Sequence, residues 1–194
     1  MSFDEIVNTY IRDHRDKVRA EMQVFADEKS PSAAIRRAAL CLRAGDKRHD
    51  HQRRIPRRVL EQAEARLQAV SKKLATASDF DTLHQLVDSE IGNVRGVGDL
   101  TAYDIAHRIG CYFGKHPERV YLHAGTRAGA RAIGIRGDSF DPAVLPKPFS
   151  RLTPAEIEDT LCIFKDALHG GKRNASSSGC AIPKKPQRHT RRVC

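Results

Sequence analysis

The stretch IGNVRGVGDLTAYDIAHRIG, residues 91–110, contains two glycines two positions apart and then changes to a helical spacing of apolar residues. Glycine permits positive φ and lets another group approach the backbone closely. Val97 stands between Gly96 and Gly98 and, being apolar, can anchor the turn in a core. The apolar face of the following helix is then supplied by Leu100, Ala102, Ile105, Ala106 and Ile109. The pattern predicts two packed helices, over 81–90 and 102–113, joined by a tight turn.

The start of the second helix is expected to attract negative charge. The first amides of a helix have no partner within it, and the helix dipole favours an anion there. The amides of Gly98, Asp99 and Leu100 are expected to point outward, and a DNA phosphate is a natural occupant. A turn that only joins two core helices remains the alternative interpretation of the same glycines.

Apolar residues at helical spacing recur along most of the chain, and they predict further helices over 3–25, 30–45, 55–75, 125–133 and 153–170. Ser30 and Thr153 each precede a proline, which is typical of N-cap residues. The Pro-containing segment 137–151 is expected to be a connector at the surface. No window shows convincing strand alternation and no internal repeat is visible, so the sequence predicts an all-α fold, with one helical domain over residues 1–170.

The C-terminal segment 171–194 is polar and basic. It carries seven Lys or Arg and no acidic residue, which leaves only +3 of the net charge of +10 for the rest of the chain. We expect a disordered basic tail, because the segment has almost no large apolar group to bury. A basic tail is typical of proteins that bind nucleic acid or another polyanion, although some basic tails only increase solubility.

Composition excludes several classes of protein. No window approaches the roughly 20 apolar residues of a membrane span, and the N-terminus has no apolar stretch of secretory type. Five scattered cysteines without a CxxC pair favour a location in the reducing cytoplasm. If the protein binds DNA, we expect it at the bacterial nucleoid. Phosphate-binding P-loop, hydrolase-elbow and zinc-protease motifs are absent from the sequence.

The turn resembles the helix-hairpin-helix family of DNA-binding motifs. The family's pattern of two glycines flanked by apolar residues is matched by Val94, Gly96, Val97, Gly98, Ala102 and Ile105. Arg95 stands where the family commonly has proline, and it adds a positive charge at the mouth of the turn. The resemblance implies that the amides bind DNA phosphates without reading sequence, that hairpin carbonyls can hold a monovalent cation, and that no other cofactor is required. RNA is not excluded as a partner, and the sequence leaves the oligomeric state open.

The resemblance extends to the helix-hairpin-helix DNA glycosylases, which act in DNA repair. The segment VYLHAGTRAGARAIG, residues 120–134, is similar to the family's catalytic segment. Aligned back from Gly134, the family's catalytic Asp falls on His123; counted forward from Gly98, it falls on Glu118. Leu100 stands where some members have a catalytic Lys. Base excision needs a carboxylate near the sugar or an amine nucleophile, so these replacements leave a glycosylase-like activity as an alternative function.

Basic residues outside the turn complete the candidate interface. The segment 43–58 holds seven Lys or Arg against two Asp and could contact DNA. Asp50 and His51 form a conceivable acid–base pair, whereas His49 and His51 lack a clear third ligand, so we predict no metal site. A second alternative function is a protein-interaction module with a nucleic-acid-binding tail. The residues that we expect to contact DNA are Arg95, Gly96, Val97, Gly98, Asp99, Leu100, Thr101, Arg127, Arg131, Arg53 and Arg54.

Overall fold

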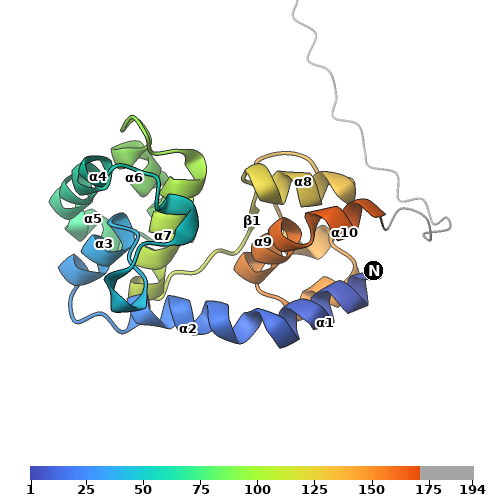
Figure 1. The fold of residues 1–194 in the computed structure, drawn as a ribbon. Helices are drawn as coiled ribbons and strands as arrows, with labels where there is room; N and C mark the ends of the chain where they lie inside the picture. The colour runs from blue at the N-terminus through green and yellow to red at the C-terminus, as the bar shows by residue number, and fades with distance from the viewer. Residues whose placement is uncertain (171–194) are drawn as a thin grey trace, which may run out of the picture.

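The computed structural model describes residues 1–170 and is mostly helical, so the prediction of an all-α fold is confirmed for this part of the chain. The expected tail, residues 171–194, lies outside the described residues. Figure 1 shows two helical lobes, one on each side of a narrower waist. The helices are α1 (Phe3–Asp13), α2 (Arg15–Ala26), α3 (Pro31–Ala39), α4 (Arg57–Ala69), α5 (Ser71–Thr76), α6 (Phe80–Ile91), α7 (Asp99–Phe113), α8 (Ala124–Ala132), α9 (Pro154–Ile163) and α10 (Lys165–Gly170).

Local capping explains where several helices begin. Ser30 accepts a hydrogen bond from the Ala33 amide ahead of α3, and Pro31 occupies the first helical position, as predicted. Thr153 and Glu156 form a reciprocal capping box at the start of α9. These caps are local side-chain-to-backbone interactions, which is why the sequence pattern identifies them.

Three predicted helices are broken in the structure. The expected helix 3–25 divides into α1 and α2 at His14, 55–75 divides into α4 and α5 at Val70, and 153–170 divides into α9 and α10 at Phe164. At Val70 the backbone has φ −108° and ψ 16°, which turns the chain so that Leu74 is fully buried. In the other direction, α7 begins at Asp99, three residues before the predicted start.

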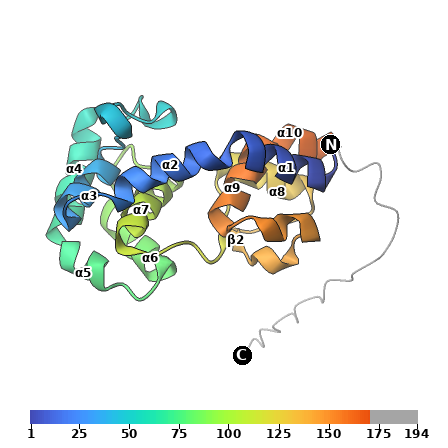
Figure 2. The same cartoon turned by 90° about the horizontal axis from the view of Figure 1, so that it is seen from below.

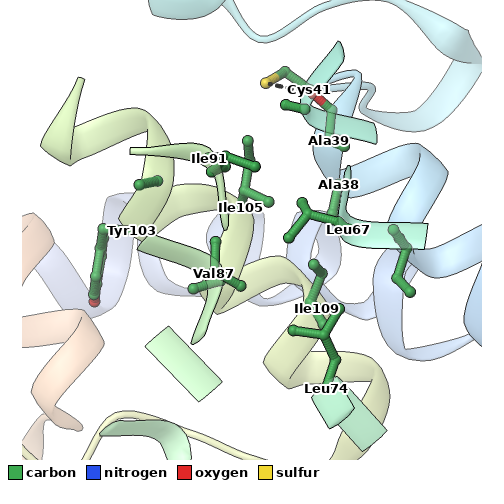
Figure 3. Close-up of a cluster of buried hydrophobic side chains, with 14 of the residues drawn as sticks. Ala38, Ala39, Cys41, Leu67, Leu74, Val87, Ile91, Tyr103, Ile105 and Ile109 are labelled. Carbon is green, nitrogen blue, oxygen red and sulfur yellow. Dashed lines mark hydrogen bonds between the residues drawn. The ribbon is translucent and has the colours of Figure 1, made fainter. Parts of the chain in front are cut away.

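The buried side chains of residues 1–170 form two cores. The first core lies among α2 to α7 and includes Phe25, Ile35, Leu60 and Ile105, and part of it is drawn in Figure 3. The second core lies among α1, the strands, α8, α9 and α10. Figure 2 shows α1 and α2 running along both lobes, so these two consecutive helices join the two cores.

The segment after α7 differs from the prediction in two ways. Two short antiparallel strands, β1 (Val120–Tyr121) and β2 (Ser139–Phe140), pair Val120 with Phe140, although the sequence predicts no strand. Segment 137–151 is not only a surface connector, because Phe140 and Phe149 are buried in the second core. Two-residue strands are too short to show alternation, so no sequence pattern could reveal them. The 3₁₀ turns are η1 (Ala44–Asp46), η2 (Asp50–Gln52), η3 (Pro142–Val144) and η4 (Lys147–Arg151).

Two glycines fix the orientation of α8. A Cβ atom added to Gly129 would lie 2.0 Å from the backbone oxygen of Leu161, and one added to Gly125 would lie 2.5 Å from Cys162 Sγ. These glycines therefore let α8 pack directly on α9. Arg127 and Arg131 follow each glycine by two positions, about 200° around the helix, so they face away from α9.

Candidate nucleic-acid interface

The turn between α6 and α7 is held by apolar side chains and by two backbone hydrogen bonds, each between residues three positions apart. Val94 is 3% exposed, and Val97 packs against the first core. The Val94 amide donates to Ile91 O, and the Val97 amide donates to Val94 O, each at 2.9 Å. Gly96 has φ +105°, and its Cβ position lies 3.5 Å from Val59 of α4, so the turn requires glycine there.

The start of α7 is open. The N-cap residue is Gly98, which has no side chain to cap the helix, and no other side chain within residues 1–170 caps it. The first helical hydrogen bond runs from the Ala102 amide to Gly98 O at 3.0 Å, so the preceding amides of residues 99–101 have no intrahelical partner. A Cβ atom at Gly98 would meet nothing within 4 Å in the described chain.

The expected contact residues of the turn divide into exposed and buried ones. Arg95, Gly96, Gly98 and Asp99 are exposed, and Leu100 is 39% exposed. Of the other two expected residues, Val97 is partly buried and Thr101 is 8% exposed. Both therefore support the turn from inside. Asp99 places a negative charge beside the open amides, where it stabilises the helix but opposes an anion.

Basic residues of the segment 43–58 come next to this turn through α4. Val59, near the start of α4, lies beneath Gly96, and the exposed Arg53 and Arg54 precede that helix. Arg58 adjoins Val59 and is exposed as well. In Figure 1 the turn lies at the top of the first lobe, whereas α2 runs along the bottom. The contact between Val59 and Gly96 therefore brings the start of α4, with Arg58, beside the turn.

A polar network whose other members are largely buried, with the exposed His51 at its edge, lies one turn further along α7. The Asp104 carboxylate accepts a hydrogen bond from Gln52 Nε2 at 2.6 Å and pairs with His51 Nε2 at 2.7 Å. Arg108, 4% exposed, donates to Gln52 Oε1 at 3.0 Å and lies 3.6 Å from Asp104. The hydrogen bond to Asp104 raises the pKa of His51, whereas burial opposes that rise. The network fixes residues 51–52 against α7.

Asp50 does not join His51 in this network. Its carboxylate is exposed and lies 3.8 Å from Arg53 and 4.0 Å from Arg43. His51 pairs with Asp104 instead, whose side chain is 17% exposed. The conceivable acid–base pair of Asp50 and His51 is therefore not formed.

His123 and Glu118, the two alternative catalytic candidates, lie in different surroundings. His123 is the N-cap residue of α8 and 8% exposed, and its ring centroid is 4.6 Å from that of Tyr103. Its Nε2 is buried without a hydrogen-bond partner among residues 1–170, and burial lowers the pKa of the imidazole. Figure 3 shows Tyr103 at the margin of the first core. Glu118 is exposed on the connection from α7 to β1.

Two carboxylates that sequence reasoning missed lie on α9, opposite α7 and α8. Burial and the neighbouring Asp159 raise the pKa of Glu158 to about 8, and Thr126 donates a hydrogen bond to Glu158. Burial raises the pKa of Asp159 to about 6, although its hydrogen bond from the Tyr10 hydroxyl at 3.1 Å opposes the shift. Asp104 is near enough to contribute to both shifts. No sequence motif marks any of these three carboxylates.

Arg127 and Arg131 lie on the outer face of α8, as their spacing predicts. Arg127 Nη2 lies 2.8 Å from Asp138 Oδ1, and Arg131 is exposed. Both line a cavity of about 360 Å³ together with Arg136, which the sequence analysis did not single out. The glycines of α8 thus have a packing role, and its arginines have a surface role.

Within residues 1–170, no three His, Cys, Asp or Glu side chains are grouped in a way that could hold a metal ion. In the same part of the chain, no helix combines the length and the apolar character needed to cross a bilayer. Comparison of the chain with models of protein families, with curated proteins and with solved structures found no match.

Proposed function

We propose that the protein binds DNA through the turn between α6 and α7, as a helix-hairpin-helix motif does, and does so largely without regard to sequence. The observation that carries this proposal is the open start of α7. Three backbone amides without an intrahelical partner follow Gly98, and the space around Gly98 is free. Such amides favour an anion, and a DNA phosphate supplies one.

The surrounding charges support a polyanionic ligand. Arg95 is exposed in the turn itself, and Arg53, Arg54 and Arg58 are exposed beside the start of α4. Backbone amides and arginines that contact phosphates position a protein on DNA but carry little sequence information. Binding of this kind weakens steeply with salt, because each phosphate contact releases counterions. RNA remains a second ligand with the same backbone chemistry.

The experiment is a titration of fluorescent duplex DNA with wild-type protein and the variant Gly98→Asp. Gly98 has an extended backbone, φ −109° and ψ 170°, and free space at its Cβ position, so aspartate fits without strain. The new carboxylate can accept hydrogen bonds from the α7 amides, which strengthens the helix cap and at the same time blocks the anion site. We expect unchanged or higher thermal stability and a loss of DNA affinity of about tenfold.

The matched control is Ala20→Glu, which makes the same change in net charge. Ala20 is exposed on α2, and Figure 1 shows α2 along the opposite side of the lobe from the turn. We expect its DNA affinity to lie within about twofold of wild type, because an exposed remote charge is screened. Equal affinities for Gly98→Asp and Ala20→Glu would show that the turn is only a connection between two helices.

One observation favours a second function, the excision of a base from DNA. Asp104 lies one turn after Leu100 on α7, and its carboxylate is among the charges that act on the pKa of the buried His123. An ionised carboxylate can stabilise the positive charge that develops on a sugar when its base leaves. Burial acts to raise the pKa of Asp104, but His51 and Arg108 reverse this effect and keep the carboxyl ionised.

The test of this second function is a panel of duplexes that carry damaged or modified bases. Wild-type protein should release at least one base, and Asp104→Asn should release none, since an amide keeps the hydrogen bonds but has no charge. The matched control is Glu118→Gln, which should retain wild-type activity because Glu118 is exposed and has no part in the Asp104 network. If no member of the panel yields an abasic site with wild-type protein, the second function is wrong.

A further inference from the structure

The cavity beside α8, here named the arginine pocket, is built from the helix and from the chain that returns to β2. Its volume is about 360 Å³, and its walls include Leu122, Arg127, Arg131, Ile135, Arg136 and Asp138. This size is at the lower end of the range of small-molecule sites, about 300 to 1,000 Å³.

The frame of the pocket is fixed by backbone hydrogen bonds. The Leu122 amide donates to Asp138 O at 2.8 Å, which continues the pairing of β1 with β2. The Ile135 amide donates to Ala130 O at 2.9 Å and ends α8. Gly134 and Gly137 have φ +88° and +122°, so the chain can reverse there and bring Arg136 back beside α8. The arginines are therefore held on a rigid support.

The charge of the pocket is strongly positive. Three arginines line it against a single carboxylate, Asp138, which is paired with Arg127. Arg131 and Arg136 form no ion pair within the described part of the chain. The packing of Gly125 and Gly129 on α9 fixes the orientation of α8, so the backbone positions of Arg127 and Arg131 stay on the side of the helix that faces away from α9.

The remaining wall is apolar. Leu122 is 2% exposed, and Ile135 is half-buried and packs against the second core. Arginine presents a planar fork of donors that matches phosphate oxygens. A phosphate monoester carries a charge of about −1.5 to −2 at neutral pH, which balances three arginines and one aspartate. The apolar wall suits an organic group attached to that phosphate.

We propose that the arginine pocket binds a nucleoside monophosphate group, with its phosphate on the arginines and its nucleoside against the apolar wall at Ile135. The group has two sources, a free nucleotide and the 5′-phosphorylated end of a nucleic-acid strand. The pocket belongs to the second core and shares no residue with the turn, so its ligand does not depend on the function proposed above.

The experiment uses the full chain and two probes. The first probe is adenosine 5′-monophosphate, titrated by calorimetry. The second is a pair of single-stranded oligonucleotides that differ only in a 5′-phosphate. The test variant is Arg131→Gln with Arg136→Gln, and the charge-matched control is Lys72→Gln with Lys73→Gln on α5 of the other lobe. All four residues are exposed, so both variants should melt at the wild-type temperature.

If free nucleotide is the source, the double variant of the pocket should bind adenosine monophosphate at least about tenfold more weakly than wild type, and the control should bind within about twofold. If strand ends are the source, wild type should prefer the phosphorylated oligonucleotide, and only the pocket variant should lose that preference. The proposal is overturned if wild type neither binds the mononucleotide nor distinguishes the oligonucleotides, or if the pocket variant behaves as the control does. Gly98→Asp should leave nucleotide binding unchanged, which separates this site from the turn.

Discussion

Replacement of Gly129 by alanine should weaken the junction of α8 and α9 and thereby the second core. The added Cβ would lie 2.0 Å from Leu161 O and 2.8 Å from Leu161 C, both backbone atoms of α9 that no side-chain rotation can move. Separating the helices by more than 1 Å costs about 3 kcal/mol, at the upper end of measured overpacking. Alanine returns about 1 kcal/mol through its helix propensity. The net loss in the free energy of unfolding is about 2 kcal/mol.

Thermal unfolding followed by circular dichroism measures this loss. For a chain of this size, about 2 kcal/mol lowers Tm by about 4 to 8 °C. Gly125→Ala serves as the matched comparison, because its Cβ would meet the Cys162 side chain, at 2.5 Å from Sγ, rather than backbone. That clash should be relieved in the double variant Gly125→Ala with Cys162→Ala, a non-additive result. A Gly129→Ala protein that melts at or above the wild-type temperature would refute the close packing of α8 on α9.

Three further predictions address charge. The contribution of Glu158 and Asp159 to stability should fall as pH rises from about 4 to about 8, because their folded pKa values, about 8 and about 6, exceed the unfolded values of 4.5 and 3.8. Relative to wild type, the free energy of unfolding of Glu158→Gln should therefore rise by about 2 kcal/mol as pH increases from 5 to 9, after allowance for partial exposure. A difference between the two proteins that stays constant across that range would contradict this prediction. Asp99→Asn should bind DNA about threefold more tightly in the same titration, since it removes a negative charge beside the amides; weaker binding would count against an anion at this position. Arg108→Met should lower the free energy of unfolding by about 3 kcal/mol in urea, because Asp104 and Gln52 lose a buried partner, and a neutral result would mean that the network contributes nothing.

Sequence reasoning identified the features that depend on near neighbours in the chain. The cap residues Ser30 and Thr153, and the anchors of the turn, Val94 and Val97, lie where the pattern places them. Each of these depends on interactions within a few residues. A helix pattern or a capping box is therefore visible without knowledge of the fold.

Features that depend on distant segments were not visible. The helix break at Val70 follows from how Leu74 reaches the first core. The sequence left open whether the glycines at 125 and 129 serve a helix or a nucleic-acid backbone, and the approach of α9 accounts for them. Asp104 could be assigned to α7 but not to its partners His51 and Gln52, more than 50 residues earlier.

The central claim is that the amides at the start of α7 contact a DNA phosphate. The most direct measurement is a ¹⁵N-resolved NMR titration of the full chain with a short duplex. The account predicts that the amide resonances of residues 98–101 shift progressively as DNA is added and return toward their free positions as salt is raised. Resonances of residues 98–101 that stay unmoved, while others shift at saturating DNA, would contradict it.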